Sequence, residues 1–332
     1  MKRILSRRSM LTAAAAMAAT PALAEEECRV GPVPHHKGPL VFMDYDQVEL
    51  DASYDQVVYQ PMIEQSSKRL ASNSDAVRAR IGEPLHAAYG PSEIEKLDIY
   101  RTGHANGSVL APVFIVIHGG NWRLGSAKAY GFAAEMFVNA GAHYIALDFT
   151  PVQNAGGDLG VMAAQVRRAI AWVYKNAASF GGDPDRIFIG GHSSGGHLCG
   201  VALVTDWQAE HGVPADIVKG GLCMSGMYDM AAVRLSWRRT YVSFTDAMAE
   251  AMSAQRHIDR LNAPIIVTYG TFETPDFQRQ SRDFAAAVKA AGKPVQLIAA
   301  PNYAHLDMAE SLGNPYGPNG RAALALMKLA SQ

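Results

Sequence analysis

The chain has little of what would mark a nucleic-acid-binding, disulfide-stapled or metal-dependent protein. Among its 332 residues, 30 Lys and Arg nearly balance 31 Asp and Glu, which leaves a formal net charge of −1. Such a balance offers no basic surface for nucleic acid, so no nucleic-acid partner is expected. Three cysteines are an odd number and allow at most one bridge within the chain. The histidines and cysteines follow no metal-ligand spacing, and neither a metal nor another cofactor is expected.

The sequence also lacks long apolar runs, and the apolar stretch near its N-terminus is short. The basic pair Arg7-Arg8 precedes an Ala-rich stretch, and Ala22-Leu23-Ala24 then has the small-x-small form of a cleavage site. The stretch is too short to span a bilayer, so residues 1–24 are predicted to be an export signal, without stable membrane insertion. The paired arginines resemble a twin-arginine signal, and a general secretory signal is the alternative. Either one predicts a periplasmic or secreted protein, with residues 25–53 as an extended N-terminal arm.

Short apolar runs predict the strands of a parallel sheet that is covered on both faces. They lie at residues 112–117, 144–147, 187–189, 265–269 and 295–298. A short run that is apolar throughout is typical of a strand buried on both sides. Segments with helical spacing lie between these runs, so residues 54–332 are predicted to form a single domain with helices on both faces of a mostly parallel sheet. Residues 230–262, rich in Met, Arg and aromatics, are the candidate for a small cap segment.

A nucleophile elbow is the strongest chemical signal in the sequence. Gly191-His192-Ser193-Ser194-Gly195 has the form G-x-S-x-G, directly after one predicted strand and directly before a predicted helix. The elbow requires this context, because the turn is so tight that the positions flanking the serine must lack bulk. Ser193 is therefore the predicted nucleophile. The neighbouring histidines His192 and His197 are interpreted as packing or rim residues.

A second glycine-rich segment is the candidate oxyanion loop. His118-Gly119-Gly120-Asn121-Trp122 directly follows an earlier predicted strand. Acyl transfer needs N–H donors that are fixed in place before a negative oxygen develops. The amides of Gly119 and Gly120 are the expected donors, and the amide of Ser194 would complete the hole. His118 ends a strand and is interpreted as a structural anchor of the loop, not as a base.

The acid and the base are expected later in the chain, in the order serine, acid, histidine. Glu273 follows closely on the strand at residues 265–269, which makes it the predicted acid. Asp276 remains the alternative, although it lies where it could instead cap the next helix. His305 is the only histidine after residue 257 and is the predicted base, which takes the serine proton and returns it to the leaving group.

These motifs together resemble the arylformamidase (kynurenine formamidase) branch of the α/β-hydrolases, which borders the hormone-sensitive-lipase-like esterases. The more specific part of the resemblance is Glu273-Thr274-Pro275-Asp276-Phe277, followed by Arg279-Gln280-Ser281. The resemblance extends from about Tyr54 to about Glu310 and implies the α/β-hydrolase fold, a mostly parallel central sheet with helices on both faces. It also implies the triad Ser193, Glu273 and His305 and the oxyanion donors Gly119, Gly120 and Ser194.

A complete triad with an oxyanion hole predicts a serine hydrolase that works through an acyl-enzyme. The leading hypothesis is a carboxylic-ester hydrolase for small or medium, aromatic or apolar substrates, because an exported enzyme would seldom meet a cytoplasmic formamide. The alternative is an arylformamidase that hydrolyses N-formylkynurenine or a related aryl formamide. A binding protein without catalysis is disfavoured, since it would be expected to have lost a triad member. Trp122, Tyr228 and Phe272 are candidate walls of the substrate site, although packing explains them equally well.

Overall fold

The computed structural model describes residues 30–103 and 109–329. The chain divides into two units, residues 1–30 and 31–332, and every helix and strand named below belongs to the second. The predicted signal at residues 1–24 lies outside the described residues.

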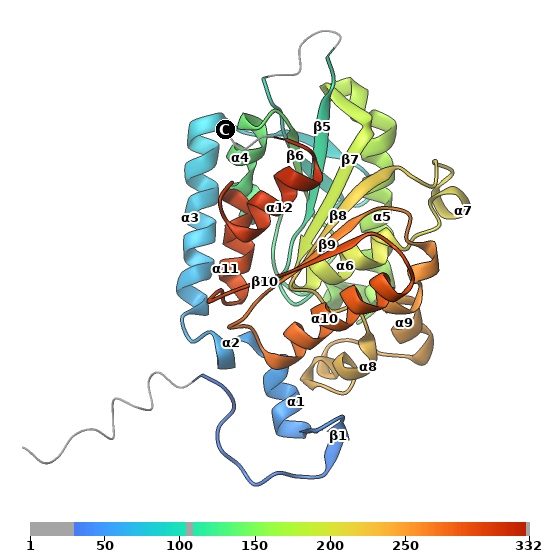
Figure 1. The fold of residues 1–332 in the computed structure, drawn as a ribbon. Coiled ribbons are helices and arrows are strands. Elements are labelled where there is room, and N and C mark those ends of the chain that lie inside the picture. The colour runs from blue at the N-terminus through green and yellow to red at the C-terminus, as the bar shows by residue number, and fades with distance from the viewer. Residues whose placement is uncertain (1–29, 104–108, 330–332) are drawn as a thin grey trace, which may run out of the picture. The chain divides into compact units, whose positions relative to one another are not determined.

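An eight-stranded sheet runs through the second unit in the order β10-β9-β8-β7-β5-β6-β4-β3 (Figure 1). The neighbours from β10 to β6 are parallel, whereas β4 pairs antiparallel with β6 and β3 pairs antiparallel with β4. The strands are β3 (Leu85–Ala88), β4 (Lys96–Tyr100), β5 (Ala111–Ile117), β6 (His143–Leu147), β7 (Gly182–His192), β8 (Val218–Met224), β9 (Ile265–Gly270) and β10 (Val295–Ala300). The predicted mostly parallel sheet is confirmed.

Both faces of this sheet are buried by helices. Along β5, Val113 and Ile115 belong to one apolar layer and Phe114 and Val116 to the other. The first layer is closed by α5 (Leu159–Asn176), α6 (Ser194–Leu203) and α10 (Pro275–Ala290). The second is closed by α3 (Ile63–Ile81), α4 (Ala134–Asn139) and α12 (Pro318–Leu326), which lie together on one side in Figure 1. This double burial is the physical reason for the continuous apolar strand sequences.

Strand β8 was not among the predicted strands, because two glycines interrupt its apolar pattern. A side chain at Gly221 would come within 2.5 Å of Leu203 on α6, and one at Gly220 within 2.8 Å of Leu326 on α12. The glycines therefore let a helix approach each face of the sheet at this strand. The two glycines serve the packing of helices that are distant in sequence, and the apolar pattern of the strand itself does not indicate such packing.

The segment expected to be an extended arm contains regular structure. Strands β1 (Leu40–Phe42) and β2 (Tyr45–Asp46) form a small antiparallel pair, and helix α1 (Gln47–Ser53) follows directly. Asp46 accepts from the amide of Glu49 at 2.9 Å, and the Glu49 carboxylate accepts from the amide of Asp46 at 3.1 Å. This reciprocal capping box starts the helix, and its D-x-x-E signature was present in the sequence.

Shorter elements fill the remaining connections. The α-helices among them are α2 (Gln56–Tyr59), α7 (Trp207–His211), α8 (Met230–Val233), α9 (Asp246–Ala251) and α11 (His305–Glu310). The 3₁₀ turns are η1 (Lys128–Ala133), η2 (Val152–Ala155), η3 (Ala177–Phe180), η4 (Trp237–Thr240), η5 (Ala254–Arg256), η6 (Ile258–Arg260) and η7 (Ser311–Gly313). The candidate cap segment, residues 230–262, thus consists of short helical turns, from α8 to η6.

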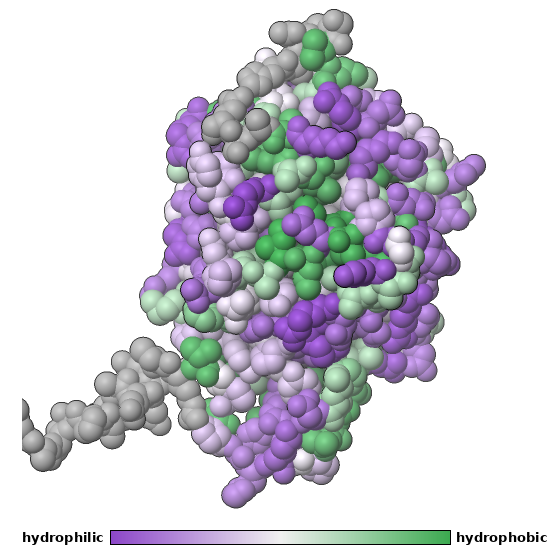
Figure 2. Space-filling view, in the orientation of Figure 1, coloured by the Kyte–Doolittle hydropathy of each residue, from purple (hydrophilic) through white to green (hydrophobic). Residues whose placement is uncertain are grey.

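The sheet edge at β10 is only partly covered. Leu297 on this strand is 41% exposed. Figure 2 shows apolar side chains near the middle of the face that carries α3 and α12, with polar residues around them.

Within the two described stretches of the chain, none of the helices combines the length and the apolar character needed to cross a bilayer.

Candidate active site

Ser193 lies at the turn between the end of β7 and the start of α6. Its backbone has φ 59° and ψ −122°, which is strained for a residue with a side chain and is typical of a nucleophile elbow. A side chain at Gly191 would lie 2.1 Å from the carbonyl oxygen of Gly195, so the turn tolerates only glycine there. Ser193 is buried, and its hydroxyl makes no hydrogen bond to any described residue. The hydroxyl is therefore not committed to a structural role.

Glu273 and His305 form a buried hydrogen-bonded pair beside the elbow. Oε1 of Glu273 lies 2.8 Å from Nδ1 of His305, and both side chains are almost fully buried. Glu273 also accepts from the amide of Gly270, at the end of β9, at 3.2 Å. An ionised carboxylate can only accept, so Nδ1 of His305 carries the proton and Nε2 is left as the basic nitrogen. The structure thus brings the predicted acid and the predicted base together.

Asp276, the alternative acid, is engaged elsewhere. The hydroxyl of Tyr54 donates to its carboxylate, and Arg279 pairs with it at 2.6 Å. The cap of α10 is Thr274, whose hydroxyl accepts from the amide of Phe277, so Asp276 is an acidic residue of the first turn and not the cap. Its carboxylate stabilises the packing of residues near Tyr54 and makes no hydrogen bond to His305.

Burial shifts both members of the acid–base pair toward their neutral forms. It raises the pKa of Glu273 to about 7 and lowers the pKa of His305 to about 3. The positive charge of Arg238 acts on His305 in the same direction as burial. The two groups share one hydrogen bond, so they are expected to titrate as a pair.

His192 connects the base to the oxyanion loop through Tyr130. Nε2 of His192 donates to the backbone oxygen of His305 at 2.9 Å, which leaves Nδ1 to accept from the Tyr130 hydroxyl at 3.3 Å. The same hydroxyl accepts from the amide of Gly119 at 3.0 Å. His192 is therefore a buried link between two parts of the site, and Tyr130 is a site residue that sequence reasoning missed.

This link changes the expected set of oxyanion donors. Gly119 lies beside the nucleophile, since a side chain there would come within 3.2 Å of Cβ of Ser193. Its amide, however, already donates to Tyr130. Within the described part of the chain, the amides of Gly120 and Ser194 make no hydrogen bond and remain available. Gly120 and Ser194 are thus the better placed of the three predicted donors.

The residues after Gly120 hold the loop in an unusual shape. Gly120, Asn121 and Trp122 all have positive φ, at 118°, 57° and 62°. Non-glycine residues keep such a strained backbone only where contacts with the surrounding structure hold it in place. Here the Trp122 indole donates to Nδ1 of His197 at 3.1 Å, and Nε2 of His197 donates to the carbonyl of Met252 at 3.0 Å. His197 therefore ties the loop to the candidate cap segment.

His118 is placed as a structural group, away from any role as a base. Its ring stacks on Phe149 with a centroid distance of 4.2 Å, and Nδ1 lies 2.8 Å from the carbonyl oxygen of Gly119. Burial lowers the pKa of His118 to about 4, so the ring is neutral at ordinary pH.

The three candidate substrate-binding residues lie in different environments. Trp122 is 1% exposed and belongs to the core. Tyr228 is fully buried and stacks on Phe284 at 4.3 Å. Phe272 is 55% exposed. The structure does not gather these rings into one wall, and substrate contact by any of them stays a prediction.

Among the described residues, two groups of side chains have atoms close enough to hold a metal ion. The ligand atoms of His192, Glu273 and His305 lie within 4.8 Å of one another, but the nitrogens of this group already serve the triad and its link to Tyr130. The second group is His35, Asp46 and Glu49, in which Asp46 starts α1 and accepts from His35 at 2.8 Å. The first arrangement fits proton transfer, and the second is accounted for by the local fold.

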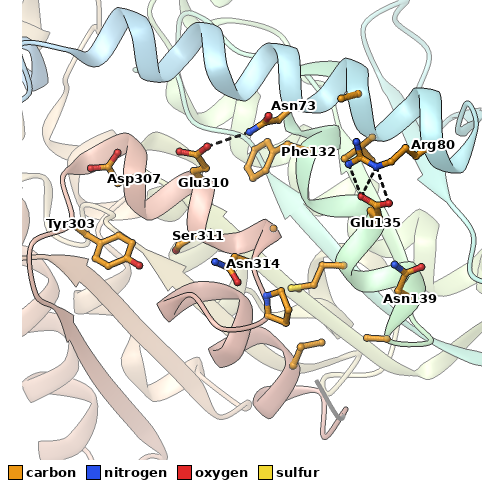
Figure 3. Close-up of a pocket in the computed structure, with 17 residues that line it drawn as sticks. Asn73, Arg80, Phe132, Glu135, Asn139, Tyr303, Asp307, Glu310, Ser311 and Asn314 are labelled. Carbon is orange, nitrogen blue, oxygen red and sulfur yellow. Dashed lines mark hydrogen bonds and ion pairs between the residues drawn. The ribbon is translucent and has the colours of Figure 1, made fainter. Parts of the chain in front are cut away.

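A cavity of about 660 Å³ lies between α3, α4 and α11 (Figure 3). Arg80 and Glu135 pair across it at 2.6 Å. Glu310 pairs with Arg69 at 2.6 Å and accepts from Asn73. The acidic side chains of this cavity are largely paired with neighbouring basic or amide groups. Neither the elbow serine nor the acid–base pair lines the cavity.

The chain has the α/β-hydrolase fold, with a serine-centred site at its elbow. The BD-FAE family model matches residues 97–216. Kynurenine formamidase of Salmo salar is 29% identical over 249 residues, which cover 73% of this chain and 81% of that protein. Esterase LipQ of Mycobacterium tuberculosis is 29% identical over 223 residues, which cover 61% of this chain and 52% of that protein. Within the α/β-hydrolases, the chain therefore resembles the arylformamidase-like branch next to the esterases, as its motifs predicted.

Solved structures show the same fold at low identity. A thioesterase candidate from Silicibacter sp. aligns with a TM-score of 0.71 at 19% identity, over 84% of this chain and 99% of that one. An esterase from Thermogutta terrifontis aligns with a TM-score of 0.58 at 22% identity, over 75% and 91%. At this level of identity the structures support the α/β-hydrolase architecture, while the relatives above support a hydrolase.

Proposed function

We propose that this protein is a serine hydrolase that cleaves a small or medium carboxylic ester through an acyl-enzyme. The observation that carries the proposal is the buried Glu273–His305 pair, joined at 2.8 Å next to the strained elbow of Ser193. Nε2 of His305 takes the proton of Ser193 as its oxygen attacks the ester carbonyl, and later returns it to the leaving alcohol. Water then attacks the acyl carbon while Nε2 of His305 takes its proton, and the bond to the Ser193 oxygen breaks as that proton returns to Ser193, which releases the acid.

The oxyanion is stabilised by backbone amides in this scheme. Those of Gly120 and Ser194 are available, and the amide of Gly119 positions the loop through Tyr130. A donor that is fixed before the reaction needs no reorganisation as charge develops, and losing one typically costs about 10²–10³ in rate.

An arylformamidase is the second candidate, because the same machinery can attack a formamide. It is favoured by the likeness to kynurenine formamidase over 249 residues. The ester is favoured by several relatives that are named esterases, among them LipQ and the isoprenylcysteine alpha-carbonyl methylesterase of Arabidopsis thaliana.

Initial rates separate the two activities. We expect residues 25–332 to hydrolyse 4-nitrophenyl acetate with a kcat/KM at least about tenfold above that for N-formylkynurenine, which is about 1.4 kcal/mol of transition-state stabilisation. Formanilide serves as an uncharged formamide, so that the amino-acid part of N-formylkynurenine is not confused with the scissile bond. A clear preference for both formamides would replace the esterase with the arylformamidase.

We propose in addition that the protein is exported to the periplasm or beyond, through the twin-arginine route. Support comes from the sequence of residues 1–24 alone. In a Gram-negative host, the full chain should appear in the periplasm with Glu25 as its first residue, and the Arg7→Lys/Arg8→Lys variant should stay in the cytoplasm. Export of that variant would favour the general secretory route, and an uncleaved cytoplasmic wild type would contradict export altogether.

A further inference from the structure

Arg238 is a fully buried cation whose hydrogen-bond partners are all neutral. It belongs to η4 of the candidate cap segment and is 0% exposed. Its guanidinium donates to the hydroxyl of Tyr241 at 3.0 Å, the carbonyl oxygen of Tyr54 at 3.2 Å and Oδ1 of Asn121 at 2.9 Å. Nε has no partner among the described residues. A guanidinium has five N–H donors, so two of the five remain unused here.

Several other arginines of this chain are paired with carboxylates. Arg279 pairs with Asp276 and Asp283, and Arg256 pairs with Asp229 and Glu250. Arg238 has instead the rings of Trp122, Trp237 and Tyr54 around its guanidinium, at 5.2, 5.6 and 5.8 Å. Aromatic faces attract a cation, but they do not neutralise it. A buried charge without a counter-ion is costly, so an anion placed beside Arg238 would stabilise it.

The position of Arg238 connects it to the reaction. Its partner Asn121 directly follows Gly120 in the oxyanion loop, and Trp122 follows next. The same charge reaches the catalytic base, where it adds to the effect of burial on the ring of His305. An unpaired cation here opposes the reaction, because His305 must become positively charged when it takes the serine proton.

We propose that Arg238 is a specificity residue that binds a carboxylate carried by the substrate, so that the preferred ester is anionic. The bound carboxylate supplies the missing counter-ion and uses the free N–H donors. It also cancels the positive field at His305, so the substrate's own charge favours the imidazolium that forms during acylation. The proposal rests on the proposed esterase function, and it deepens that function by naming the charge of the substrate.

Matched substrate pairs test the proposal on both sides of the scissile bond. For the acyl side, mono-4-nitrophenyl glutarate is compared with 4-nitrophenyl pentanoate. For the leaving side, 4-acetoxybenzoate is compared with its methyl ester. In at least one pair, wild type should favour the anion in kcat/KM by about tenfold or more, and Arg238→Met should reduce this ratio by about 10- to 100-fold. Arg238→Lys should retain part of the preference, because it keeps the charge and loses the planar donors.

Arg239→Met is the matched control, since Arg239 is the exposed neighbour on the same turn. It should leave the anion-to-neutral ratio as in wild type. If Arg238 only holds the cap segment in place, Arg238→Met slows both members of each pair equally and the ratio does not move. That result overturns the proposal, and so does a wild type that shows no preference in either pair, whether or not any variant folds.

Binding separates this proposal from the esterase assignment. The Ser193→Ala protein is titrated calorimetrically with the mono-4-nitroanilide of glutaric acid and the 4-nitroanilide of pentanoic acid, and with 4-acetoxybenzoate and its methyl ester. Tighter binding of one anion, lost in Ser193→Ala/Arg238→Met, supports the carboxylate site even if wild type hydrolyses no ester. Ester turnover without any anion preference in rate or binding keeps the esterase and overturns the carboxylate site.

Discussion

Replacing Ser193 by alanine should lower kcat by at least about 10⁴-fold, toward the residual rate that oxyanion stabilisation and binding provide without a nucleophile. Alanine removes Oγ, the atom that would attack the carbonyl carbon. Folding should persist, because the Ser193 hydroxyl makes no hydrogen bond to the described residues and alanine keeps the same Cβ at φ 59°. Ester hydrolysis and thermal unfolding, measured on the same preparation, check both halves of this expectation.

Ser281→Ala is a suitable control for this loss. Ser281 is as buried as the nucleophile and lies on α10, and its hydroxyl has no hydrogen-bond partner among the described residues. Both variants therefore lose a buried serine hydroxyl, and only the loss at Ser193 should affect turnover. More than a trace of activity in Ser193→Ala, with the protein folded, would mean that another residue is the nucleophile.

Local motifs predicted much of the fold and the main catalytic candidates. The strands β5, β6 and β9 are continuous apolar runs, because both of their faces are buried. The elbow was visible because its glycines and its serine are neighbours in sequence. The acid and base followed from the order of residues in the resembled family, and the structure places Glu273 and His305 in contact.

The rest depended on contacts between distant segments. Tyr130 became a site residue only because the fold brings it to Gly119 and to His192, which lies 62 positions further along the chain. Arg238 was one of several arginines in the candidate cap segment, and its burial beside Asn121 is a tertiary feature. Short-range patterns carry no signal for such contacts, so the fine structure of the oxyanion loop and the charge near the base could not be read from them.

The second large loss is expected for Glu273→Gln, which should lower kcat/KM by about 10³–10⁴-fold. The carboxylate holds the proton of His305 on Nδ1, so that Nε2 can accept from Ser193. A glutamine amide can donate to Nδ1 instead, which leaves the proton on Nε2 and the ring unable to act as a base. Asp276→Asn, the matched loss of a buried carboxylate, should cost activity far less, because Asp276 bonds to Tyr54 and Arg279. The opposite order of the two losses would move the acid role to Asp276.

The pH profile of the same two variants tests the reason for that loss. Burial raises the pKa of Glu273 to about 7 and keeps His305 neutral, so lowering the pH through 7 protonates the acid before the base. A protonated Glu273 donates to Nδ1 and imposes the unreactive tautomer, as the amide of glutamine would. The kcat/KM of wild type and of Asp276→Asn should therefore fall as the pH drops through about 7, whereas the residual rate of Glu273→Gln should lack this step. A wild-type profile that stays flat from pH 9 down to about 5 would show that Glu273 remains ionised in the folded enzyme, and would contradict the expected protonation of the acid near pH 7.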